Sequence, residues 1–511
     1  MTHTAAVRSI ILLGIAAGIL AGGCQPGSPR QPAQQEPAPE AAEPAPRAEA
    51  PKKIVPDEGA LRCTETPAPA GTGTPHAMKP PAAPDAAEPE DLIQKRSTAE
   101  GKENEPAFTD QEENGQLVLE RGRVKIFRLA RGGYRMFVNE EPFLIKGVIY
   151  NPTPIGKGYN YEFYNDPAKP WLTDGKLMEE MGINCVRVYC AGSDLEKTRE
   201  FIRDMYEKFG IYTVLSDWIG LWEYPPPNYA DPQFQKKTTD RILETVETLK
   251  DEEGLLMWVL GNENNYTFSG KIGFWTNEEI EALEEPCDKI FRKAEIYYSF
   301  VNDLAKKIKE IDPDHPVALS NGEESFLDIA SREAPQIDIL AIISYRGKRF
   351  GSLFRNVRNF YDKPVFLSEF GADSYDSLRK EPAPEIQAEY LLSQWESLYK
   401  NSVWSGNERG NVLGGIIFEW TDEWWKHNEG YEKDWNVHNP EAGWSEGAYY
   451  YDIRAENNMN MSEEWFGIVG IQREVKEGLN LREPKDAYFA LQQEFTRPLV
   501  TRPLDPATPT E

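Results

Sequence analysis

Basic residues are in short supply in this chain. Its 511 residues include 56 Lys and Arg against 84 Asp and Glu, which gives a formal net charge of −28. Binding to nucleic acid requires clustered Lys and Arg that neutralise phosphates. The charge balance therefore argues against a nucleic-acid partner and favours a neutral or cationic one.

Histidine and cysteine are also scarce, with five of each. The histidines form no ligand pair at helical spacing, and no Gly-rich phosphate loop follows the first expected strand. Cys185 and Cys190 lie on one expected strand and face opposite sides, while Cys287 is isolated. We expect no catalytic metal, no cofactor and no disulfide framework, and a structural Ca²⁺ among the acidic loops stays open.

Long apolar runs are confined to the N-terminus. After Arg8, the stretch Ile10 to Leu20 is apolar, and small residues then lead to Cys24. This arrangement resembles a bacterial lipoprotein signal, in which such a cysteine is acylated. We predict a signal peptide over residues 1–24, lipidation at Cys24, export, and attachment to the bacterial cell envelope through the lipid alone. A plain secretory signal or a single membrane anchor is the alternative, and no later run is long enough to span a bilayer.

Aromatic residues are nearly absent from residues 25–105, which hold about sixteen of the 39 prolines. Such a composition buries too little apolar surface to offset the conformational entropy of the chain. We predict a disordered tether over 25–105 and a tail over 499–511.

Strand-like and helix-like patterns fill the rest of the chain. A short alternating pattern predicts a small β extension over 106–140, and eight apolar runs then alternate with amphipathic segments. Eight such units in series predict a (β/α)8 TIM barrel over 141–498, an α/β fold whose active site lies at the C-terminal ends of its strands. The expected strands cover residues 143–150, 183–190, 211–219, 255–263, 316–322, 337–345, 363–371 and 414–422. The expected helices cover residues 194–210, 238–254, 300–313, 385–401 and 483–495.

Carboxylate, amide and aromatic side chains follow these strands and would meet at one mouth of the barrel. Glycoside cleavage needs two carboxyl groups, while aromatic rings, amides and Arg suit the binding of sugars. Glu263 and Glu369 are the predicted catalytic pair, because each directly ends an apolar strand, although a single Glu at a strand end is usually just solvated. The remaining candidates for substrate binding are Arg187, Asp217, Trp218, Asn262, Asn321, Tyr345 and Trp420.

Two motifs make a family resemblance specific. "WVLGNE" and "PVFLSEFGA" resemble the acid/base and nucleophile signatures of retaining clan A glycoside hydrolases, and residues 134–496 are similar to family 2 barrels and to β-1,3-glucanosyltransferases. The resemblance implies that Glu263 is the acid/base and Glu369 the nucleophile. It also implies that Asn262 bonds the sugar 2-hydroxyl, that Tyr345 holds an oxygen of the nucleophile, and that Arg187 keeps the nucleophile ionised.

Some assignments keep an alternative. Trp420 resembles the aromatic platform under the cleaved sugar, with core packing as the alternative, and Asp217 and Glu419 are secondary carboxylates or salt-bridge partners. The aromatic insertion over 419–452 is either a wall of the substrate cleft or packing over the barrel rim. Family 2 enzymes usually place jelly-roll and immunoglobulin-like domains before the barrel, so exo-acting specificity is not carried over.

The sequence thus predicts a retaining glycosidase that cleaves a β-linked, β-glucan-like glycan through a covalent intermediate. An oligo- or polysaccharide is the expected partner. A transglycosylase using the same two glutamates and a non-catalytic glycan-binding protein of the envelope are the alternatives.

Overall fold

The computed structural model describes residues 115–499, except for 222, 224, 271–272, 377–378, 427–431 and 440–461. The predicted signal peptide with Cys24, the tether over 25–105, nearly all of the tail and much of the 419–452 insertion lie outside the described residues.

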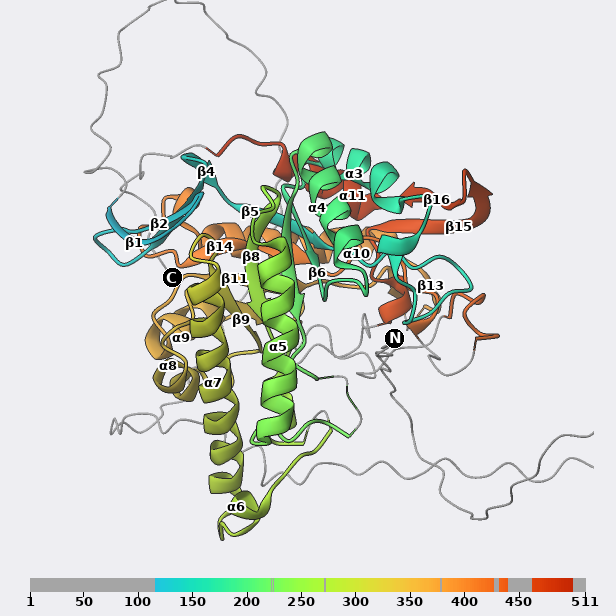
Figure 1. Cartoon of the computed structure of the whole chain (residues 1–511). Helices are drawn as coiled ribbons and strands as arrows, with labels where there is room; N and C mark the ends of the chain where they lie inside the picture. The colour runs from blue at the N-terminus through green and yellow to red at the C-terminus, as the bar shows by residue number, and fades with distance from the viewer. Residues whose placement is uncertain are drawn as a thin grey trace, which may run out of the picture.

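Eight parallel strands form a closed barrel, which confirms the predicted (β/α)8 fold (Figure 1). In chain order these are β5 (Ile145–Ile149), β6 (Cys185–Val188), β7 (Tyr212–Asp217), β8 (Leu255–Leu260), β9 (Val317–Gly322), β10 (Ile339–Ile343), β11 (Val365–Phe370) and β14 (Val412–Ile417). Seven of them lie inside the predicted ranges. β14 begins two residues earlier than its predicted range and ends at Ile417, because the chain then leaves the barrel and Thr421 pairs with Val469 of a hairpin instead.

Helices pack around the barrel, and the described residues contain more helices than the sequence predicted, some of them longer than expected. The longer ones are α3 (Pro170–Met181), α4 (Leu195–Phe209), α5 (Pro232–Leu249), α7 (Pro286–Ile311), α10 (Pro384–Lys400) and α11 (Asp486–Phe495). The short ones are α6 (Glu278–Glu281), α8 (Leu327–Glu333) and α9 (Leu353–Phe360). Several begin with a proline at the first turn, where its missing N–H costs nothing, so α5 and α7 start well before the predicted boundaries.

A small antiparallel sheet closes one end of the barrel. Its strands are β1 (Gln116–Arg121), β2 (Val124–Arg128), β3 (Tyr134–Val138) and β4 (Glu141–Phe143). Alternate side chains of β2 and β3 are buried together with residues of the barrel interior, and Asn139 Nδ2 donates to the Tyr212 hydroxyl at 2.9 Å. The sheet is therefore part of the same hydrophobic core as the barrel.

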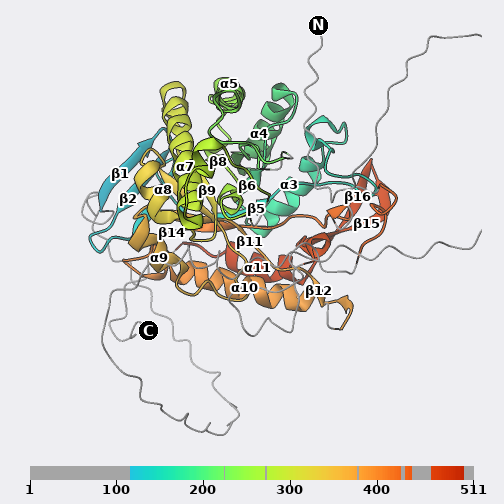
Figure 2. The same ribbon diagram turned by 90° about the horizontal axis from the view of Figure 1, so that it is seen from below.

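Two further hairpins belong to the opposite end. They are β12 (Tyr375–Asp376) with β13 (Glu381–Pro382), and β15 (Val469–Lys476) with β16 (Leu479–Pro484). Both views place β15 and β16 across the molecule from β1 and β2 (Figures 1 and 2). Lys485 fastens this end, because its Nζ donates to Asp422 Oδ1 at 2.7 Å and to Ser374 Oγ at 2.8 Å.

Glycine is required where the barrel closes between β14 and β5. Gly414 has φ +120°, and a Cβ atom there would lie 2.1 Å from the Ile145 carbonyl oxygen. Only glycine adopts this backbone conformation without strain and permits this approach.

The cysteines depart from expectation at one position. Cys185 and Cys190 are free, as predicted, but Cys287, near the start of α7, is disulfide-bonded. The sequence predicted no disulfide framework and described Cys287 only as isolated, so this bond was not anticipated.

Among the described helices, none combines the length and the apolar character that crossing a membrane requires.

The sheet that closes the barrel should contribute directly to stability. Met136 on β3 has no exposed surface, so we expect Met136→Ala to lower the free energy of unfolding by about 2–5 kcal/mol. Leu117→Ala is the matched control, because this side chain on β1 is 42% exposed and its loss should cost less than about 0.5 kcal/mol. Denaturant unfolding would measure both, and equal effects of the two substitutions would contradict the role of Met136 in the shared core.

Candidate active site

A buried arginine organises the C-terminal ends of the barrel strands. Arg187 on β6 has no exposed surface. Its Nε donates to Ser216 Oγ at 2.9 Å, its Nη1 to Glu369 Oε1 at 3.0 Å, and its Nη2 to Asn262 Oδ1 at 2.7 Å. Nη1 also donates to the Ser368 carbonyl at 3.0 Å. One guanidinium thus joins β6, β7 and β11 to the residues that follow β8.

Glu369, near the end of β11, has both carboxylate oxygens hydrogen-bonded. Oε1 accepts from Arg187 and, at 2.9 Å, from the Tyr189 hydroxyl, and Oε2 accepts from the Tyr345 hydroxyl at 3.0 Å. Burial, followed by the charge of Glu369, raises the pKa of both Tyr189 and Tyr345 well above the usual range. Both phenols therefore remain hydrogen-bond donors over the working pH range.

Glu263 lies on a tight turn directly after β8. Its φ is +64°, a left-handed conformation that is uncommon for a residue with a side chain. Tyr345 experiences the negative charge of both Glu369 and Glu263, so the two glutamates belong to one electrostatic environment around this phenol. The structure thus brings the predicted catalytic pair to the same end of the barrel.

Asn264 stabilises that turn. Its Oδ1 accepts from the Asn262 N–H at 2.7 Å, and its Nδ2 donates to the Trp218 carbonyl at 2.9 Å and to the Tyr229 hydroxyl at 2.8 Å. These bonds offset the strain of the left-handed Glu263. Asn264 was not among the candidates predicted from the sequence, although its position immediately after Glu263 was a signal that could have identified it.

Two predicted binding residues have structural partners instead. Asp217 forms an ion pair with Arg241 on α5 and accepts from the Ile219 N–H at 2.8 Å, which is the salt-bridge alternative. Asn321 Oδ1 accepts from the Tyr298 hydroxyl at 2.6 Å, and its Nδ2 donates to the Glu323 carbonyl at 3.0 Å. Because these contacts hold loops, the structure does not join Asp217 or Asn321 to the Arg187 network.

Of the two tryptophans predicted to bind substrate, one lies beside Glu369 and the other packs in the core. Trp218 is partly exposed and its ring centroid lies 5.3 Å from that of Tyr189, beside Glu369. Trp420 has no exposed surface and packs near Tyr488 of α11, so no sugar can stack on it in this structure. Its position matches the core-packing alternative. Phe418 lies closer to the site, with its ring edge-to-face to Tyr345 at 6.3 Å.

Three carboxylates and a lysine gather beside this site, and we call them the acidic wall: Glu419, Glu423, Glu463 and Lys426. Lys426 Nζ lies 3.3 Å from Glu423 Oε2 and 3.2 Å from Glu463 Oε2. Glu419 has no exposed surface, and no N–H or hydroxyl of the described residues donates to it. Burial and the charge of Glu423 raise the pKa of Glu419 well above its usual range, which favours the protonated, neutral form of its carboxyl group.

The described parts of the 419–452 insertion pack onto neighbouring loops. The ring of His438 stacks between Trp424, at 4.7 Å, and Trp465, at 3.4 Å. The Gly156 N–H donates to the Trp435 carbonyl at 2.9 Å. These contacts fix the insertion against the loop after β5 and the segment before β15.

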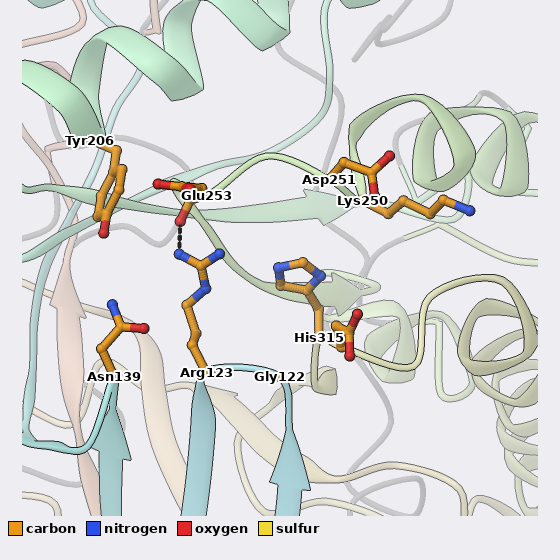
Figure 3. A pocket seen from close by; sticks show the side chains of 9 residues that line it. Gly122, Arg123, Asn139, Tyr206, Lys250, Asp251, Glu253 and His315 are labelled. Atoms are coloured by element: carbon orange, nitrogen blue, oxygen red, sulfur yellow. Dashed lines mark hydrogen bonds between the residues drawn. The ribbon is translucent and has the colours of Figure 1, made fainter.

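A cavity at the other end of the barrel is separate from this site (Figure 3). Its volume is about 500 Å³, and it lies between the β1–β4 sheet and the loops that lead into β8 and β9. Arg123 reaches across it and donates to the Glu253 carbonyl (Figure 3). Active sites of TIM barrels lie at the C-terminal ends of the strands, which is the opposite end of this barrel, so we assign this cavity no catalytic role.

Comparison with known proteins decides the family. A model of the TIM barrel domain of glycosyl hydrolases family 2 matches residues 131–480. The chain belongs to glycosyl hydrolase family 2.

Several curated proteins are similar to this family 2 barrel. A beta-galactosidase of Leuconostoc mesenteroides is 24% identical over 63% of this chain and 26% of its own length. A beta-glucuronidase of Rattus norvegicus is 20% identical over 56% of this chain and 40% of its own length. A 1,3-beta-glucanosyltransferase of Saccharomyces cerevisiae is 23% identical over 55% of this chain and 53% of its own length. The chain therefore spans a quarter to a half of the length of these relatives.

Among solved structures, Bacteroides uniformis beta-glucuronidase 2, covalently bound to cyclophellitol-6-carboxylate aziridine, aligns with a TM-score of 0.47. Its sequence identity is 17%, and the alignment covers 73% of this chain and 37% of that one.

Tyr189, whose hydroxyl donates to Glu369, is a further residue of this site that was not among the candidates predicted from the sequence. It lies two positions after Arg187, so both side chains point to the same face of the strand. That spacing was a usable signal. In the part of the chain that the structure describes, no three His, Cys, Asp or Glu side chains cluster in a way that could hold a metal ion.

The buried proton on Glu419 makes stability depend on pH. Because folding raises this pKa, the stabilisation is complete below the unfolded-state pKa of about 4.3 and is lost as the pH rises towards the folded-state pKa. The loss is at most about 1.4 kcal/mol per pH unit. We expect Glu419→Gln to avoid it, so the thermal stability of the variant relative to wild type should increase from pH 4 to pH 7. Glu253→Gln, an exposed site at the other end of the barrel, is the control, and a pH-independent difference for Glu419→Gln would contradict the prediction.

Proposed function

We propose that this family 2 barrel is a retaining glycosidase that cleaves a β-linked, β-glucan-like glycan through a covalent glycosyl-enzyme intermediate. The observation that carries the proposal is the environment of Glu369. Arg187, Tyr189 and Tyr345 hydrogen-bond both of its oxygens, at the same barrel end as Glu263. Three fixed side chains of this kind orient a nucleophile before the substrate arrives.

The proposed reaction divides the work between the two glutamates. Glu369 attacks the anomeric carbon while Glu263 donates a proton to the glycosidic oxygen, and the bond to the leaving sugar breaks. Glu263 then takes a proton from an acceptor hydroxyl, which displaces Glu369 and restores the enzyme. Arg187 and the two tyrosines hold Glu369 in both steps.

The acceptor decides between hydrolysis and transfer. Water as the acceptor releases a free sugar, and a sugar hydroxyl gives transglycosylation with the same two glutamates. The likeness to a 1,3-beta-glucanosyltransferase supports transglycosylation as the second candidate. Analysis of the products from β-1,3-linked oligosaccharides separates the two, because only transfer yields products longer than the substrate.

Substitution of the two glutamates tests the proposal. We expect Glu369→Ala to abolish turnover of aryl β-glycosides, because no other group can attack the anomeric carbon. We expect Glu263→Ala to lower kcat by about 10²–10⁴-fold on substrates whose leaving group needs protonation. Azide should restore turnover of Glu369→Ala by attacking the anomeric carbon itself, giving a glycosyl azide of inverted configuration, and NMR of the product would show this.

Glu253→Ala is the matched control, since it removes a glutamate at the opposite end of the barrel. Full activity in Glu369→Ala would reject the assigned nucleophile. A wild-type protein that binds β-glucans but neither cleaves nor transfers them would favour the non-catalytic binding protein instead.

A further inference from the structure

The acidic wall lies next to the proposed catalytic pair. Tyr189, which donates to Glu369, also experiences the charges of Glu419 and Glu423. Tyr345, the other donor to Glu369, also experiences the charge of Glu463. The ring of Phe418 links Tyr345 to the acidic wall, because its centroid lies 6.3 Å from that of Tyr345 and 5.8 Å from Lys426 Nζ. A sugar bound against Glu369 would therefore approach the acidic wall.

The wall is rich in acceptors and has few donors to offer. Asn151 Nδ2 already donates to Glu423 Oε1 at 2.6 Å, and Lys426 already lies between Glu423 and Glu463. Glu419 is fully buried, and within the described residues no N–H or hydroxyl satisfies its carboxyl oxygens. Hydroxyl groups complement such a surface, because a hydroxyl can donate to a carboxylate oxygen and can also accept from a protonated carboxyl group such as that of Glu419.

A carboxylate on the ligand would be repelled by the acidic wall. Arg187 is fully buried behind Glu369, and the charge of Lys426 is balanced by two carboxylates. A uronic acid would add a negative charge without a free cation in the described part of the wall to receive it. Like charges about 5 Å apart in a partly buried site cost enough to lower affinity on the order of 100-fold.

We propose that the acidic wall makes this barrel select a sugar with an uncharged, hydroxyl-bearing side over a uronic acid at the cleaved residue. The selection rests on the proposed function, because it concerns the sugar that Glu369 attacks. It sets this chain apart from the beta-glucuronidases among its relatives, whose names specify a charged sugar.

Covalent labelling of the full chain tests the selection without a known natural substrate. The probes are cyclophellitol aziridines of gluco and galacto configuration, each compared with its own 6-carboxylate, and intact-mass spectrometry measures the labelling rates. We expect a neutral probe to label wild type about 100-fold faster than its 6-carboxylate, with the label on Glu369.

A variant of the acidic wall tests whether the wall causes the preference for the neutral probe. Glu463→Gln frees Lys426 from one of its two carboxylates, so the preference for the neutral probe should narrow by about tenfold or more. Glu253→Gln at the opposite end of the barrel is the control and should leave the preference unchanged. Unfolding of the Glu463→Gln variant is checked by its melting temperature, and the wild-type preference stands as a test by itself.

The possible outcomes distinguish a failure of the proposed sugar selection from a failure of the proposed function. Labelling of Glu369 by a 6-carboxylate as fast as by its neutral counterpart overturns the selection and leaves the proposed function intact. A preference that Glu463→Gln does not change overturns the assignment to the wall. No labelling of Glu369 by any of the four probes overturns the proposed function, and the selection with it.

Discussion

The buried guanidinium of Arg187 is the constraint on which the catalytic end of the barrel depends. A charge with no access to water must be matched by a counter-charge and by acceptors for its N–H groups, or it costs several kcal/mol. Glu369 supplies the counter-charge, and Ser216, Asn262 and the Ser368 carbonyl supply the acceptors. Stability and the orientation of the proposed nucleophile therefore rest on the same hydrogen bonds.

Hydrogen bonds also stabilise the strained backbone at Glu263. A left-handed backbone at a glutamate is unfavourable by itself. The side chain of Asn264 stabilises it by accepting from the Asn262 N–H before it and by donating to the Trp218 carbonyl of the neighbouring loop. Gly261 begins the turn with φ +79°, where a Cβ atom would lie 2.4 Å from the Tyr297 hydroxyl. The surrounding residues thus hold the strained backbone of Glu263 in place, and they keep its side chain in one orientation.

The sequence was sufficient to predict the barrel and the location of Glu263 and Glu369, because apolar strands buried on both faces and polar residues at their ends are local signals. It was insufficient for Trp420, because the direction of that side chain depends on where β14 ends, and β14 ends at Ile417. Asn321 and Asp217 have the right chemistry for sugars, but Tyr298 and Arg241, distant along the chain, occupy them. The disulfide of Cys287 likewise depends on tertiary structure rather than on spacing.

The β1–β4 sheet also fixes how the molecule can be held. It closes the barrel end opposite Glu263 and Glu369, and the chain enters the described structure through β1. A restraint on the chain at Gly115 would therefore act on the closed end of the barrel, and the end that carries Glu263 and Glu369 would face away from it.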